Sequence, residues 1–159
     1  MLRVGIGFDA HKFAENRKLI ICQVEISYKF GLEGHSDADV ALHALCDAIL
    51  GALGEKDIGH YFPPTDPKLK GISSKEILNF VLSLLKNKGF EIVNIDLTLI
   101  AQEPKFSPYI DIMKDSLSKL LKIPKENIGL KATTAEKMLF TEGIGCMAVV
   151  LLKSVNLKI

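Results

Sequence analysis

Residues 37–53 read DADVALHALCDAILGAL, and this stretch has the pattern of a helix with one apolar side. Its apolar residues recur at about the 3.6-residue period of a helix. Asp39, His43 and Asp47 are spaced four residues apart and therefore lie along one stripe beside the apolar surface. Ser36, followed by Asp39, predicts the start of the helix. One face of this helix thus carries a histidine between two carboxylates.

Strands and further helices are predicted on both sides of this helix. Apolar stretches bounded by turn residues predict strands, and helical periods predict two more helices. Strands are expected at residues 1–8, 18–27, 92–101 and 144–153, helices at residues 73–88 and 107–121, and a loop rich in glycine and proline at residues 54–72. We therefore expect an α+β fold, an α/β sandwich in which helices cover one face of a mainly four-stranded mixed sheet.

Length and charge narrow the class of protein. The chain has 159 residues, so we predict a single domain at residues 1–159. Its net charge of +1 offers no broad field for nucleic acid or an anionic membrane, and we expect a small-molecule partner. The N-terminus turns charged too early for a signal peptide, and no apolar run is long enough to cross a bilayer. We therefore expect a cytoplasmic protein.

The three cysteines give no support for disulfides or a thiolate metal cage. Cys22, Cys46 and Cys146 are isolated, and their number is odd. We expect them to be small buried hydrophobic residues.

Asp9, His11 and His43 are candidate metal ligands. Asp9 and His11 are two residues apart at the end of the first predicted strand, so both side chains lie on the same face. With His43 they form a set of one carboxylate and two imidazoles, which is typical of catalytic zinc with an open fourth position. Asp47 or Asp39 could accept a hydrogen bond from His43. The alternatives are ordinary core or surface histidines and a solvated acidic helix face.

Three further segments could bind phosphate. His35 and Ser36 stand at a helix N-terminus, where free N–H groups favour an anion. Without further context, an exposed loop histidine is the more common case. Residues 101–105 leave the third predicted strand, residues 131–137 leave a further candidate strand, and Glu136 could hold a hard cation. The same residue types also occur in ordinary helix caps.

The sequence shows no candidate for covalent catalysis. No serine or cysteine is visibly paired with a base and an orienting acid. Gly5 and Gly7 lack the third glycine of a dinucleotide fingerprint, and no phosphate-loop lysine motif occurs.

Five blocks of sequence together resemble one enzyme family. In order, they are GIGFDAH (5–11), EGHSDADVALHALCDAILGAL (33–53), DIGHYFPPTDP (57–67), LTLIAQEPK (97–105) and LKATTAEKMLF (130–140). They closely resemble the 2-C-methyl-D-erythritol 2,4-cyclodiphosphate synthase family. The resemblance implies a homotrimer with active sites between subunits. It also implies cyclisation of 4-diphosphocytidyl-2-C-methyl-D-erythritol 2-phosphate with release of CMP, in the non-mevalonate route to isoprenoid precursors.

The resemblance also assigns roles to residues by position. Asp9, His11 and His43 correspond to zinc ligands, and Glu136 to a contact with Mg²⁺ or Mn²⁺ on the nucleotide diphosphate. His35 and Thr134 correspond to residues that stabilise the transition state. The remaining assignments are substrate contacts: Ser36, Asp57, Ile58, Gly59, Phe62 and Asp66 at the erythritol phosphate, and Ala101, Lys105, Phe106, Ser107, Ala132, Thr133 and Phe140 at the cytidine diphosphate.

This reaction agrees with the missing nucleophile, because the substrate's own 2-phosphate attacks the β-phosphorus. The protein then needs only positioning and charge neutralisation. Two alternatives stay open: a zinc phosphoesterase that activates water, and a cytidine-nucleotide binding module with a structural metal.

The chain departs from the family pattern at three places. Pro64 stands where an acidic residue is frequent, and Ala135 replaces a threonine. The glycine-arginine-glycine that usually precedes a segment like Glu142–Gly145 is missing. We therefore assign no binding of isoprenoid diphosphates at the trimer axis.

Overall fold

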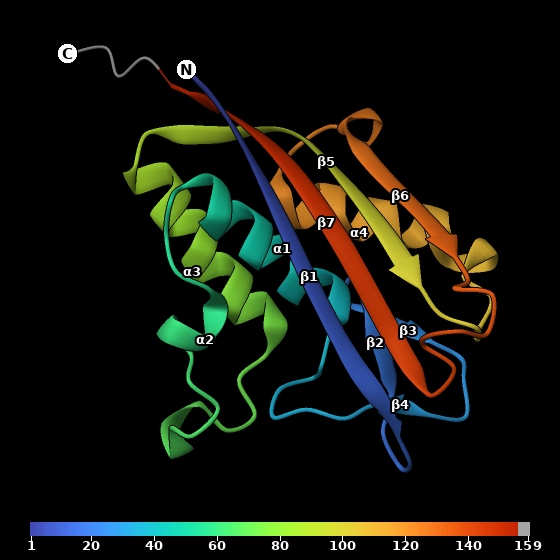
Figure 1. Cartoon of the computed structure of the whole chain (residues 1–159). Coiled ribbons are helices and arrows are strands. Elements are labelled where there is room, and N and C mark those ends of the chain that lie inside the picture. Colours follow the sequence, from blue (N-terminus) through green and yellow to red (C-terminus); the bar gives the residue numbers. More distant parts are fainter. Residues whose placement is uncertain (156–159) are drawn as a thin grey trace.

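A mixed sheet forms the centre of the computed structural model, which describes residues 1–155 (Figure 1). The last four residues of the predicted domain, 156–159, lie outside the described part. The strands run in the order β4-β1-β7-β5-β6, and only β5 and β6 are parallel neighbours. Their bounds are β1 Leu2–Ala14, β4 Gly31–Leu32, β5 Phe90–Ile100, β6 Ile128–Thr133 and β7 Gly143–Ser154. Three long strands and the six-residue β6 therefore form the sheet, with a two-residue strand added at one edge.

Helices cover one face of this sheet, as expected for an α+β fold. The main ones are α1 (Val40–Ala52), α3 (Ser74–Asn87) and α4 (Ile110–Leu121). In Figure 1 the strands pass in front of α1 and α4, and α3 lies beside α1. Nearly every residue of α1 is buried, because this helix lies between the sheet and α3. The described residues share one apolar core between the two layers. None of the helices in residues 1–155 is long and apolar enough to cross a membrane.

β1 and α1 approach so closely that no side chain fits between them. A Cβ atom on Gly7 would lie 1.9 Å from the carbonyl oxygen of Ala44, and one on Gly5 would lie 1.9 Å from that of Ala48. Glycines on the strand and alanines on the helix therefore allow backbone contact. This contact places His43, one residue before Ala44, beside the strand that carries Asp9.

Replacing Gly7 with alanine is expected to lower the free energy of unfolding by about 2 kcal/mol or more, because the helix backbone must move. Gly51 is the matched control, because it lies in α1 with its nearest atom 3.7 Å from an added Cβ. Gly51→Ala is expected to be neutral or stabilising by about 0.5 kcal/mol, because alanine favours the helix. Urea unfolding at one protein concentration measures both, and equal stability of the two variants would contradict the close contact.

The prediction of one strand at residues 18–27 is wrong, because two short strands form a hairpin there. β2 (Leu19–Ile21) pairs with β3 (Val24–Ile26). The turn residues Cys22 and Gln23 both have left-handed backbones, with φ of 54° and 58°. Such a turn normally uses asparagine and glycine. Here the Asp39 carboxylate accepts both turn N–H groups, at 2.9 and 2.7 Å.

Several predicted boundaries also need correction. The first helix begins after Asp39, whose side chain accepts the N–H of Leu42, and not at Ser36. The loop at residues 54–72 contains α2 (Ile58–Tyr61) and the 3-10 turn η1 (Pro67–Leu69). Other 3-10 turns are η2 (Ser107–Tyr109), which precedes α4, and η3 (Lys125–Asn127).

Candidate metal centre and substrate site

Asp9 lies between two histidines. Its Oδ2 atom is 2.8 Å from His11 Nε2 and 3.2 Å from His43 Nδ1. Asp9 and His11 lie inside β1, which continues to Ala14, and not at a strand end as predicted. His43 comes from α1, and its side chain is only 10% exposed. The three predicted ligands therefore meet at one place, with one donor atom from each lying within 4.8 Å of the others.

The electrostatics of this group favour a cation at the shared point. Burial raises the pKa of Asp9, but hydrogen bonds with His11 and His43 outweigh burial and bring its pKa below the usual value. Burial lowers the pKa of His11, yet the Asp9 carboxylate raises it above the usual value overall. Two imidazole nitrogens and a carboxylate oxygen form a donor set that suits zinc with one position open. A divalent ion there would compete with protons for these donor atoms.

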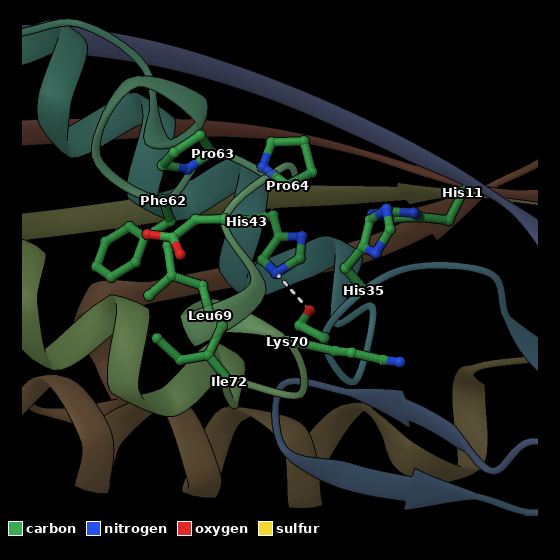
Figure 2. Close-up of a pocket in the computed structure, with 11 residues that line it drawn as sticks. His11, His35, His43, Phe62, Pro63, Pro64, Leu69, Lys70 and Ile72 are labelled. Atoms are coloured by element: carbon green, nitrogen blue, oxygen red, sulfur yellow. Dashed lines mark hydrogen bonds between the residues drawn. The ribbon is translucent and has the colours of Figure 1, made fainter.

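The remaining nitrogen of His43 points away from this group. Its Nε2 atom lies 2.8 Å from Ser74 Oγ and 3.3 Å from Ser36 Oγ. The dashed line in Figure 2 marks the second of these contacts. The prediction that Asp39 or Asp47 accepts a hydrogen bond from His43 is wrong. Asp39 accepts backbone N–H groups from the hairpin and from α1, and Asp47 accepts the N–H of Ile58 at 2.9 Å.

Arg17 holds the loop between β4 and α1, and the sequence analysis missed it. Its guanidinium donates to the carbonyl oxygens of Gly34 at 2.7 Å and Ser36 at 2.6 Å. An added Cβ on Gly34 would lie 3.5 Å from the His11 ring. This loop therefore packs against one ligand while it carries Ser36 toward another.

A cavity of about 170 Å³ opens beside the two histidine ligands (Figure 2). Four of the predicted substrate and catalytic residues line it: His35, Ser36, Phe62 and Asp66. In Figure 2 the apolar side chains of Phe62, Leu69 and Ile72 gather on one side of His43. The other lining residues are Pro63, Pro64 and Lys70, of which only Pro64 had been singled out. Lys70 supplies a positive charge for an anion, but no spacing in the sequence linked it to the metal group.

The other residues predicted for the erythritol end lie nearby but outside that cavity. Asp57 caps α2 by accepting the N–H of His60 at 3.0 Å. It lines a more open pocket together with Asp47 and Phe8. Ile58 is half-buried and Gly59 is exposed on the same short helix.

The residues predicted to hold the nucleotide gather at the ends of β5 and β6. These strands are parallel, and Ile100 pairs with Thr133, so the loops that follow them lie at the same edge. The N–H of Ala101 donates to the Thr133 carbonyl at 3.1 Å. Lys105, Ser107, Ala132, Thr133 and Glu136 are exposed, Thr134 and Phe140 are half-buried, and Ala101 and Phe106 are buried.

The loop after β6 has an unusual backbone. Glu136, Lys137 and Phe140 adopt left-handed conformations, with φ of 51°, 61° and 56°. The Glu136 N–H donates to Thr134 Oγ1 at 3.3 Å. Non-glycine residues in this region cost energy and are often found at functional sites. The loop thus carries a cation candidate and a catalytic candidate next to each other.

Within one chain the two groups of predicted residues stay apart, except that the Phe140 ring lies 6.2 Å from the ring of Phe8 on β1. β7 and β5 lie between β1 and β6 in the sheet, a separation of about 14 Å at the usual strand spacing. The cavity beside the metal group is lined by none of the residues predicted for the nucleotide. One chain therefore contains two half-sites that do not face a common cavity. The metal half-site is Asp9, His11 and His43 with the cavity beside them, and the nucleotide half-site consists of the predicted residues at the ends of β5 and β6.

Comparison with known proteins identifies the family. A model described as the YgbB family matches residues 2–153. A 2-C-methyl-D-erythritol 2,4-cyclodiphosphate synthase of Clostridium acetobutylicum is 55% identical and covers 95% of this chain and 99% of its own. One from Geobacillus thermodenitrificans is 51% identical and covers 96% of this chain and 98% of its own.

Solved structures agree with this match. A structure of a 2C-methyl-D-erythritol-2,4-cyclodiphosphate synthase in a CDP-bound form is 38% identical, with a TM-score of 0.89. It covers 95% of this chain and 100% of its own. The Plasmodium falciparum protein IspF in a CDP complex is 34% identical, with a TM-score of 0.84. It covers 98% of this chain and 97% of its own. The resemblance seen in the sequence motifs is confirmed, and the chain belongs to the YgbB family.

Proposed function

We propose that this chain is a 2-C-methyl-D-erythritol 2,4-cyclodiphosphate synthase. It converts 4-diphosphocytidyl-2-C-methyl-D-erythritol 2-phosphate to the 2,4-cyclodiphosphate and CMP, in the non-mevalonate route to isoprenoid precursors. The observation that carries the proposal is the convergence of Asp9, His11 and His43 beside a cavity that also holds His35 and Lys70. Near-full-length relatives with this name support it. The enzyme is a lyase that forms a ring by breaking a phosphorus–oxygen bond.

The active site uses two cations. Asp9, His11 and His43 would hold Zn²⁺. Glu136 would contact Mg²⁺ or Mn²⁺ at the nucleotide diphosphate. When bound, such ions act as Lewis acids and hold phosphate oxygens in place. The protein itself positions the 2-phosphate in line with the β-phosphorus, while His35, Lys70 and Lys105 reduce the negative charge. Thr134 offers a hydroxyl to the phosphate oxygens beside Glu136.

Product analysis tests the proposed reaction. The zinc-loaded enzyme with magnesium and the cytidylyl substrate is expected to give CMP and the cyclic diphosphate in equal amounts. CMP with a linear bisphosphate would instead indicate a zinc phosphoesterase. Binding without any product would indicate a nucleotide-binding module, and either outcome would reject the proposed cyclisation.

Lys105→Ala is expected to weaken CDP binding about 10-fold to 100-fold, because one charge-assisted hydrogen bond to phosphate is lost. Lys105 is exposed beside the nucleotide half-site, whereas zinc binds at the other half-site. Zinc content is therefore expected to stay unchanged. Lys119→Ala, which removes an exposed lysine on α4, is the matched control. Calorimetric titration with CDP measures the effect, and equal affinity in both variants would contradict the assigned pocket.

The enzyme assembles as a homotrimer whose active sites lie between subunits. The face of β1 and β7 opposite the helices carries an exposed apolar surface: Leu2, Val4, Ile6, Phe8, Met147 and Val149. A contiguous apolar surface of this kind marks an interaction site. Further copies of the chain that cover this face can bring the metal half-site of one subunit to the nucleotide half-site of another. This assembly accounts for the separation of the two half-sites within one chain.

The remaining proposals concern the setting of the enzyme. The whole chain, residues 1–159, forms one domain, and its partner is the cytidine diphosphate-linked substrate, with no role for nucleic acid or membrane. We place the enzyme in the cytoplasm, where thiols stay reduced. The buried, unpaired state of Cys22, Cys46 and Cys146 supports this location.

A further inference from the structure

Ser74 and Asp37 lie directly behind the His43 imidazole. Ser74 is the first residue of α3 and is fully buried, although serine is a polar residue. Its Oγ atom lies 2.8 Å from His43 Nε2 and also bonds Asp37 Oδ1. Asp37 comes from the loop before α1 and is fixed in turn by Gln23 Nε2 at 3.0 Å. Three segments distant in sequence thus meet behind one proposed metal ligand.

The chemistry of these groups sets the direction of the hydrogen bonds. An ionised carboxylate can only accept, so the Ser74 hydroxyl must donate to Asp37. The Ser74 oxygen is then free to accept, and it takes a hydrogen bond from His43 Nε2–H. In the metal-loaded state, a neutral imidazole that keeps its proton on Nε2 would offer its lone pair on Nδ1. Nδ1 is the atom that lies 3.2 Å from Asp9 Oδ2 at the metal group.

We propose that Ser74 and Asp37 act as positioning residues that hold the His43 proton on Nε2 and so present Nδ1 to the metal. This inference rests on the proposed metal site. Ser36 Oγ lies farther from Nε2, at 3.3 Å, and already accepts the N–H of Ala38 at 3.1 Å. Ser74 is therefore the main acceptor for His43. Such partners of ligating histidines orient the ring and raise its affinity for the metal.

Zinc affinity tests this role without reference to activity. Ser74→Ala is expected to weaken zinc binding about 10-fold to 100-fold in competition with a chelator, as is usual when a histidine ligand loses its partner. Ser73→Ala is the matched control. Ser73 caps the same helix through the N–H of Glu76 at 3.2 Å, so its loss loosens the start of α3 without touching His43. Equal weakening by both variants would overturn the proposal.

Asp37→Asn provides a second test with nearly unchanged shape. Asparagine carries a donor as well as an acceptor, so Ser74 is no longer forced to donate away from His43. We expect Asp37→Asn to bind zinc more weakly than the wild type. The double variant Asp37→Asn with Ser74→Ala should bind zinc no more weakly than Ser74→Ala alone, because the two residues act as one unit. Fully additive losses in the double variant would overturn the proposal.

Nuclear magnetic resonance of the zinc-loaded protein gives a direct readout of the proton. The wild type is expected to show a slowly exchanging His43 Nε2–H signal, which is lost or exchanges rapidly in both variants. If Ser74→Ala does not fold, Asp37→Asn decides, and an unchanged signal with unchanged affinity would overturn the proposal. A wild-type protein that binds no zinc would reject the metal site itself. If the wild type binds zinc and the variants bind it just as tightly, only the positioning role would be rejected.

Discussion

His43→Ala is expected to lower zinc affinity more than about 100-fold and activity by at least as much, because it removes a ligand and not merely the partner of one. Asp9 and His11 then hold the ion with two donors, too few for a three-ligand site. The fold is expected to survive, because alanine favours the helix more than histidine does. The space left by the imidazole borders a cavity that water can fill.

His60→Ala makes the same chemical change away from the metal group. His60 is exposed on α2 and does not contact the metal group. Metal analysis after dialysis and the rate of CMP release should both match the wild type in this control. Full zinc occupancy in His43→Ala would contradict the ligand assignment. Loss of helical circular dichroism would show instead that His43 is needed for the fold.

The metal ligands could be predicted because local periodicity governs them. Asp9 and His11 share a face wherever the strand ends, so the wrong strand boundary did no harm. The family motifs then joined His43 to them. The acceptor for His43 Nε2 could not be predicted in the same way. Helical spacing offered Asp39 and Asp47, whereas the acceptor is Ser74, 31 residues away on another helix.

Tertiary contacts also explain why the roles of Asp39 and Arg17 could not be predicted from the sequence. Asp39 looked like a member of the polar stripe near His43, but its carboxylate fixes the turn at Cys22 and Gln23. A hairpin turn without asparagine or glycine gives no local signal in the sequence. Arg17 likewise acts through two backbone carbonyls, which any sequence offers.

Val4→Asp is expected to convert the proposed trimer to monomers and to lower activity about 100-fold or more. Val4 is 69% exposed in the single chain, on the apolar face that we assign to subunit contact. Burying an unpaired carboxylate there in three copies costs several kcal/mol for each charge. The folded chain tolerates the change, because Val4 points away from the core on the side opposite the helices. Light scattering gives the mass, and CMP release gives the activity.

Ile112→Asp separates this effect from a general loss of surface hydrophobicity. Ile112 is a branched apolar residue that is 54% exposed, but it lies on α4 and not on the open face of the sheet. The Ile112→Asp variant should keep the same oligomeric state and activity as the wild type. Activity should fail in Val4→Asp even though every predicted ligand and substrate residue is intact, because the two half-sites of one chain do not share a cavity. A Val4→Asp monomer with full activity would show that one chain completes the site alone, and would overturn the shared active site.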